Sequence, residues 1–145
     1  MPVSITYQQI EDFLKWTTEK GRMLFSARSQ KAFPILSNCI YWTDLGINVG
    51  SEQGKYRPAL VTRSYSKSNI CTIIPLTTQR LNDGYYYHVD LQCLNSTALV
   101  EQMRIIDKIR IDKPMYKNQK IAKITSADWQ EINAQIKANY LLQPL

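Results

Sequence analysis

The chain has 145 residues, of which 44% are hydrophobic and 21% are charged, and its formal net charge is +6. This length predicts one globular domain that buries about two thirds of its unfolded surface. No apolar stretch approaches the roughly 20 residues of a membrane span, and Glu11 and Asp12 precede any run long enough for a signal peptide. We therefore expect a cytoplasmic protein with no membrane partner, whose basic charge favours an anionic partner.

The first expected element is an amphipathic helix within residues 4–31. Ser4 or Thr6 is available as its N-cap, and Gly21 is expected to interrupt it. Side chains for one face recur at spacings of three and four, namely Tyr7, Ile10, Phe13, Leu14 and Thr17. Because such a face usually covers core, we expect this N-terminal extension, residues 1–36, to pack on the domain that follows.

Residues 39–111 change to short segments rich in β-branched and aromatic residues, separated by Gly, Asn, Asp or Ser. Five such segments are CIYWTDL (39–45), PALVTR (58–63), NICTIIPL (69–76), YYYHVDL (85–91) and TALVEQM (97–103). This pattern predicts short strands that form a small barrel or a tightly curled sheet. In the fourth segment, strand alternation would send Tyr86 to one face and Tyr85 and Tyr87 to the other.

The last expected element is a helix over residues 125–142. It opens with a capping-box pattern, Thr125 and Asp128, and it should lie against the sheet. Its expected inner face consists of Trp129, Ile132, Ile136 and Tyr140.

Several motifs are absent from the sequence, and their absence excludes classes of enzyme mechanism and of metal site. His88 is the single histidine, so mechanisms with two imidazoles and Cys/His metal sites are excluded, and we interpret His88 as structural. There is no phosphate-binding loop, dinucleotide fingerprint or hydrolase elbow, so no cofactor and no metal is expected. Three cysteines without a CxxC pair are interpreted as buried reduced thiols, namely Cys39, Cys71 and Cys93.

Polar residues gather where predicted strands begin or end. They are Glu52, Gln53, Arg57, Thr77, Thr78, Gln79, Glu101, Gln102 and Arg104. If neighbouring strands bring these ends together, a carboxylate, a guanidinium and a hydroxyl meet in one groove. Such a set suits cleavage of RNA by its own ribose 2′-hydroxyl, which needs a proton acceptor and a fixed cation but no metal.

In this hypothesis Arg57 supplies the cation, because a planar guanidinium grips phosphate oxygens with two hydrogen bonds. Thr77 donates its hydroxyl to the scissile phosphate or orients it. Either Glu52 or Glu101 takes the proton, and the pattern alone does not choose between them.

Several segments, in order and at their spacing, carry a resemblance to a known family. YWTDLGINVGSEQGKYRPALV, IIPLTTQ, HVDL and TALVEQMRIIDKIRI, followed by a terminal helix, resemble the MazF/PemK family of toxin endoribonucleases from toxin–antitoxin pairs. The resemblance implies an SH3-like small barrel of about five to seven strands with a C-terminal helix over residues 37–145. It also implies a homodimer that binds single-stranded RNA, leaves 2′,3′-cyclic phosphate and 5′-hydroxyl ends, and is blocked by a cognate antitoxin.

The resemblance also assigns residues. Its RP arginine falls on Arg57, its strand-end threonine on Thr77, and its acidic residues on Glu52 and Glu101, so these four are the candidate catalytic residues. The candidate RNA-binding residues are Ser51, Gln53, Lys55, Thr78, Gln79, Gln102 and Arg104. Some branches carry an arginine where this chain has Leu99, so that arginine's role in proton transfer does not transfer.

Other interpretations stay open. A toxin of the related CcdB type, which binds a topoisomerase and cleaves nothing, or an inactive barrel would share the fold. Residues 1–36 lie outside the family core and could instead extend a dimer interface or contact the antitoxin. A basic stretch is either a phosphate-tracking surface or a solvated face, with Lys108, Arg110, Lys113, Lys117, Lys120 and Lys123 as its members.

Overall fold

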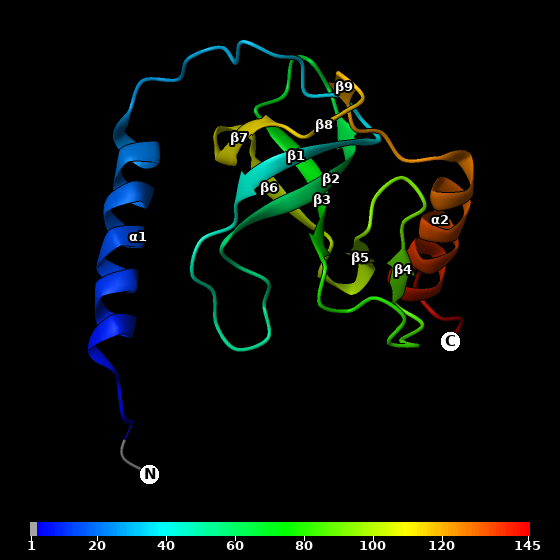
Figure 1. Ribbon diagram of the computed structural model, residues 1–145, viewed down its shortest axis with the longest axis horizontal. Helices are drawn as coiled ribbons and strands as arrows, with labels where there is room; N and C mark the ends of the chain where they lie inside the picture. Colours follow the sequence, from blue (N-terminus) through cyan, green and yellow to red (C-terminus); the bar gives the residue numbers. More distant parts are fainter. Residues whose placement is uncertain (1–2) are drawn as a thin grey trace.

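The computed structural model describes residues 3–145, where an antiparallel sheet lies between an N-terminal and a C-terminal helix (Figure 1). The helices are α1 (Tyr7–Phe25) and α2 (Ser126–Tyr140), and the two 3-10 turns are η1 (Val100–Gln102) and η2 (Lys108–Arg110). The strands are β1 (Cys39–Asp44), β2 (Tyr56–Ser64), β3 (Ile70–Thr77), β4 (His88–Asp90), β5 (Thr97–Leu99), β6 (Arg104–Asp107), β7 (Ile111–Pro114), β8 (Tyr116–Lys117) and β9 (Lys120–Ile121). The predicted mainly β fold with a helix at each end is confirmed.

The main sheet has seven strands in the order β4-β5-β3-β2-β1-β7, and β6 pairs with β3 beside this path. All its pairings are antiparallel. Strand β3 is central because it pairs with β2 along its length, with β6 at its start and with β5 at its end. Strand β3 therefore joins β2 to β5 and β6, which lie far from β2 in the sequence, in one sheet.

Both faces of the sheet are covered, which explains the continuous apolar runs of β2 and β3. Ile40, Leu60 and Ile74 face one side and pack in a core that includes Ile132 of α2. The alternate residues of the same strands form a second core on the opposite face, with Tyr41, Ala59, Val61, Cys71 and Ile73 among its members.

Helix α2 begins as the sequence predicted. The Thr125 side chain accepts a hydrogen bond from the Asp128 amide, and the Asp128 carboxylate accepts one from the Thr125 amide. Ile132 is buried, and the Tyr140 hydroxyl donates to the Val100 carbonyl at 2.7 Å. The expectation that Trp129 belongs to the core was wrong, because its side chain is 51% exposed.

Helix α1 departs most from expectation. Thr6 is its N-cap and Gly21 does not interrupt it, but it ends at Phe25 and buries none of its residues. Figure 1 shows it beside the sheet rather than upon it. Its contact with the domain runs through Trp16, whose ring packs against Gly46 and lies 5.5 Å from the Arg110 guanidinium. The expected core-covering role was therefore wrong, and its apolar stripe stays exposed.

Two predicted strands are shorter than expected. Strand β4 begins only at His88, so residues 85–87 do not alternate across a sheet, and the Tyr86 and Tyr87 rings lie against each other. Strand β5 ends at Leu99, and the chain continues as the 3-10 turn η1. Glu101 and Gln102 thus lie on a turn, where their side chains leave the plane of the sheet.

The three cysteines are buried and free, as predicted. Burial raises the pKa of Cys71 and of Cys93 to about 11, so both stay protonated at neutral pH. Within residues 3–145, neither helix combines the length and apolarity needed to cross a lipid bilayer.

Candidate functional site

Arg57 lies at the start of β2 and Thr77 at the end of β3, and these two strands are antiparallel neighbours. The strands pair Ala59 with Pro75, Leu60 with Ile74 and Val61 with Ile73. Arg57 and Thr77 each lie two residues beyond the Ala59–Pro75 pair, toward the same end of the two strands. The predicted cation and hydroxyl therefore belong to neighbouring strands of one sheet.

The loop over residues 45–55 folds back on Arg57. The Leu45 amide donates to the Lys55 carbonyl at 2.9 Å, and the Lys55 amide donates to the Gly46 carbonyl at 2.6 Å. Arg57 Nε donates to the Gly54 carbonyl at 2.7 Å, which fixes the plane of the guanidinium. Gly54 is required here, because a β-carbon at this position would overlap the Gly46 carbonyl oxygen.

Gln102 and Arg104 hold the same loop from the other side. The Gln102 side chain accepts from the Gln53 amide at 3.3 Å and donates to the Ser51 carbonyl at 3.2 Å. Arg104 Nη2 donates to the Gln53 carbonyl at 2.9 Å. Four of the predicted RNA-binding residues therefore come together here, because Gln102 and Arg104 contact Ser51 and Gln53 of the loop.

The site is electrostatically unbalanced. Burial lowers the pKa of Arg57, and burial together with the charges of Arg110 and Arg57 lowers the pKa of Arg104. Glu52 only partly offsets this repulsion. Arg104 Nε is buried with no hydrogen-bond partner among the described residues. An anion bound here would relieve the repulsion and accept donors that now lack partners.

The other predicted residues lie at the rim. The Thr77 hydroxyl accepts from the Gln79 amide at 3.3 Å, and Thr78 and Gln79 are exposed. Glu52 and Lys55 are exposed on the loop, where Lys55 has a left-handed φ of 68°. Their side chains are thus free to contact a ligand that enters beside Arg57.

Glu101 lies apart from the loop contacts and bonds to His88. Its Oε1 lies 2.9 Å from His88 Nε2, and Asp83 Oδ2 lies 2.7 Å from His88 Nδ1. Sequence reasoning interpreted His88 as structural but did not predict its contacts with Asp83 and Glu101. The feature that could have indicated these contacts is the pairing of β4 with β5, which sets His88 opposite Leu99, two residues before Glu101.

Three members of the basic stretch donate to backbone carbonyls. Lys108 Nζ donates to the Tyr65 carbonyl at 2.6 Å, Lys117 Nζ donates to the Cys93 carbonyl, and Arg110 Nη1 donates to the Asp44 carbonyl at 3.3 Å. These contacts lie on different elements, and the assignment of the stretch to a phosphate-tracking surface or to a solvated face stays a prediction.

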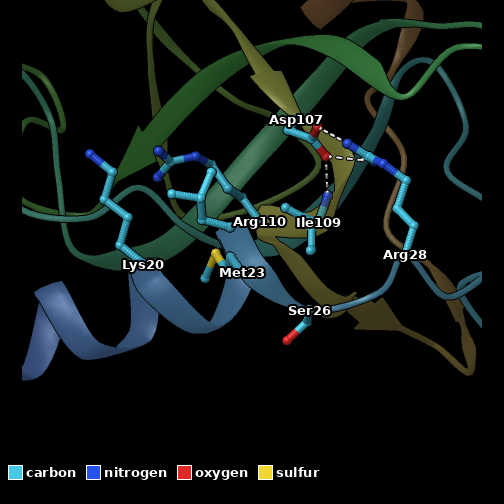
Figure 2. A pocket seen from close by; sticks show the side chains of 8 residues that line it. Lys20, Met23, Ser26, Arg28, Asp107, Ile109 and Arg110 are labelled. Carbon is cyan, nitrogen blue, oxygen red and sulfur yellow. Dashed lines mark hydrogen bonds and ion pairs between the residues drawn. The ribbon is translucent and has the colours of Figure 1, made fainter.

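A separate cavity of about 310 Å³ lies between α1 and η2. Figure 2 shows Lys20 and Met23 of α1 on one side and Arg110 with Ile109 on the other, while Arg28 pairs with Asp107 at the rim. It borders the candidate site through Arg110, whose charge also acts on Arg104.

Comparison with known proteins adds a family and relatives. Residues 38–140 match the PemK-like, MazF-like toxins of type II toxin–antitoxin systems. Over 72 residues the chain is 35% identical to the endoribonuclease toxin MazF of Escherichia coli strain K12, a match that covers 46% of this chain and 63% of that relative. The chain thus spans less than two thirds of that relative's length.

Two solved structures share the fold. MazF from Deinococcus radiodurans superimposes with a TM-score of 0.58 at 20% identity, covering 70% of this chain and 92% of that one. MazF in a MazE-MazF structure from the same organism gives a TM-score of 0.53 at 20% identity, covering 70% of this chain and 91% of that one.

Proposed function

Because this chain belongs to the family of PemK-like, MazF-like toxins of type II toxin–antitoxin systems, we propose that it is an endoribonuclease that cleaves single-stranded RNA. The relative from Escherichia coli carries the name endoribonuclease, which supports this activity. The observation that carries the proposal is the convergence of two guanidinium groups on the loop 45–55, where Arg57 donates to the Gly54 carbonyl, Arg104 donates to the Gln53 carbonyl, and the charge of Arg57 acts on Arg104.

The reaction needs no metal in this proposal. A base removes the proton of the ribose 2′-hydroxyl, the 2′-oxygen bonds to phosphorus, and the bond from phosphorus to the 5′-oxygen breaks. The 5′-oxygen takes a proton from water, which leaves a 2′,3′-cyclic phosphate and a 5′-hydroxyl. Arg57 and Arg104 stabilise the negative charge that grows on the phosphoryl oxygens, and the Thr77 hydroxyl donates to one of them.

Glu101 is the proposed proton acceptor. A general base must be held in place, and the contact with His88 holds this carboxylate. Glu52 lies exposed on the loop, with its backbone amide bonded to the Val49 carbonyl and its charge near Arg104. We assign Glu52 to closing the loop over the RNA rather than to proton transfer.

The rim residues are proposed to contact RNA bases and phosphates. Hydroxyl and amide groups suit the edges of unstacked bases, and a lysine suits a phosphate. The residues assigned to this task are Ser51, Gln53, Lys55, Thr78, Gln79 and Gln102. Of these, Gln53 and Gln102 also keep the loop in place.

We propose two protein partners, a cognate antitoxin and a second copy of the chain. A similar solved structure is titled as a MazE-MazF assembly, which supports the antitoxin. The exposed apolar residues of α1, among them Phe13, Leu14 and Leu24, offer a surface beyond the family core for either partner. The proposed substrate, mRNA, places the action in the cytoplasm.

Incubation of the purified protein with single-stranded RNA in excess EDTA tests the proposal. We expect cleavage to persist, with products that end in a cyclic phosphate, as shown by mass spectrometry and by sequencing of the RNA ends. Cleavage that occurs with Mg²⁺ but is lost in EDTA would contradict metal independence. Intact RNA with and without Mg²⁺ would contradict the nuclease and favour a binding protein of the CcdB type.

Gly54→Ala is expected to lower the cleavage rate by up to about 100-fold while the fold survives. The added β-carbon meets the backbone of Gly46, so the loop must shift and carry the partner carbonyl of Arg57 with it. A displacement near 1 Å costs about that much in catalysis. Gly50→Asn is the matched control, because Gly50 has open space around it and asparagine tolerates its φ of 57°. Equal rates for the two variants would contradict the role of the loop.

A further inference from the structure

His88 bridges two carboxylates that come from different parts of the chain. Its Nδ1 faces Asp83 Oδ2 at 2.7 Å, and its Nε2 faces Glu101 Oε1 at 2.9 Å. The imidazole is only 9% exposed, and the Tyr85 ring lies 5.3 Å from it. Asp83 is itself fixed, because its other oxygen accepts from the Tyr85 amide at 3.0 Å.

The number of protons in this cluster follows from hydrogen-bond chemistry. A neutral imidazole has one N–H donor and one lone pair, whereas an ionised carboxylate only accepts. Two short contacts to two carboxylates therefore require one more proton than the neutral ring carries. With Asp83 on one side and Glu101 on the other, an imidazolium places an N–H toward each carboxylate and offsets the repulsion between them.

A metal ion does not explain the cluster. The two carboxylates contact opposite nitrogens of one ring, so one ion could not bind both carboxylates together with a ring nitrogen. Among residues 3–145, no group of three or more His, Cys, Asp or Glu side chains has the arrangement to hold a metal ion.

We propose that His88, held by Asp83, is the positioning residue that keeps the Glu101 carboxylate in place to accept the 2′-hydroxyl proton. The inference rests on the proposed RNA cleavage and adds to it the source of the base's orientation. The turn η1 connects the two parts of the site, because Gln102, the next residue, bonds to the loop 45–55.

Two other ionisable groups lie near the cluster. They are Arg80, beside Asp83, and Tyr140 of α2, whose pKa is raised by burial and by the charge of Glu101.

The test is the steady-state kinetics of RNA cleavage by the full chain and its variants. His88→Ala is expected to lower kcat by about 10- to 100-fold with KM within about twofold, because the base loses its position. His88→Gln keeps a donor toward Glu101, so it should retain more activity than His88→Ala. Asp83→Asn keeps the acceptor for the Tyr85 amide but removes the charge that holds the ring, so it should lower kcat with little change in KM. Asp12→Asn, on exposed α1, removes the same charge and should leave both constants in place.

A second readout does not depend on RNA. His88 is the single histidine of the chain, so its ring nitrogens can be followed by NMR without ambiguity. We expect the ring nitrogen signals to change in Glu101→Gln and in Asp83→Asn, because each variant alters one of the two carboxylate contacts of the ring. Ring signals that neither variant changes, or a His88→Ala protein that cleaves as fast as the wild type, would overturn the inference while cleavage itself stands. RNA left intact by the wild-type protein would overturn the proposed function and the role of His88 in it.

Discussion

Arg57→Ala is expected to lower kcat/KM for RNA cleavage by about 100- to 1000-fold, the cost of removing one preorganised donor to a developing negative charge. The guanidinium is half-buried and is fixed through Nε to the Gly54 carbonyl. Its remaining donors are oriented before RNA arrives, so no reorganisation is needed during the reaction. Steady-state kinetics on an RNA with one cleavage site measures the change.

Arg57→Lys should recover little of this rate, because an ammonium cannot grip two phosphate oxygens in one plane. Arg63→Ala on the same strand is the matched control, since Arg63 is exposed and lies over the Tyr65 ring away from the site. The fold of both Arg57 variants should survive, because each loses about one hydrogen bond, worth about 1 kcal/mol. Arg57→Ala also relieves repulsion with Arg104. A rate for Arg57→Ala within tenfold of the wild type would contradict the role of this cation.

The sheet could be predicted because its strands carry their own signal. β2 and β3 are short runs of β-branched and aliphatic residues that end at polar segments, and both faces are buried. The capping boxes of both helices are equally local, since the N-cap and the residue three positions later satisfy each other. Order and spacing of the motifs then gave the family.

Contacts between distant segments could not be predicted in the same way. Gln102 and Arg104 hold a loop about fifty positions earlier in the chain, and nothing near either segment specifies the other. The bond between His88 and Glu101 depends on the register of β4 on β5 and on the turn that replaces the end of the fifth predicted strand. An apolar run does not reveal that its backbone turns at Val100.

Helix α1 shows a different limit of periodic patterns. Its spacing predicted an amphipathic helix correctly, but periodicity describes one helix and not the surface that covers it. Trp16 of α1 contacts Gly46 and Arg110 of the domain, and Trp16 is not a member of the apolar stripe. The apolar side chains that the sequence pattern predicted to be buried are therefore exposed at the surface.

Asp128→Ala is expected to destabilise the fold by about 3 to 5 kcal/mol, because three backbone donors lose a buried charged acceptor at once. The carboxylate is 1% exposed and accepts from the amides of Gln92 at 2.7 Å, Thr125 at 3.0 Å and Cys93 at 3.3 Å. The carboxylate therefore caps the N-terminus of α2 and also joins this helix to the turn between β4 and β5. Urea unfolding followed by circular dichroism measures the change, and Glu131→Ala, an exposed position of the same helix, should stay within about 0.5 kcal/mol of the wild type.

The same carboxylate should make the fold sensitive to acid. Burial alone would raise the pKa of Asp128, but the amides of Gln92, Thr125 and Cys93 outweigh it and lower that pKa. The unfolded chain holds this proton with a pKa of about 3.9, so the stabilisation is complete above that pH and is lost as the pH falls through the lower folded-state pKa. Asp128→Asn removes the titrating group, so its free energy of unfolding should fall less steeply than that of the wild type below about pH 4. Parallel curves for the two proteins over that range would show that another carboxylate controls the acid transition.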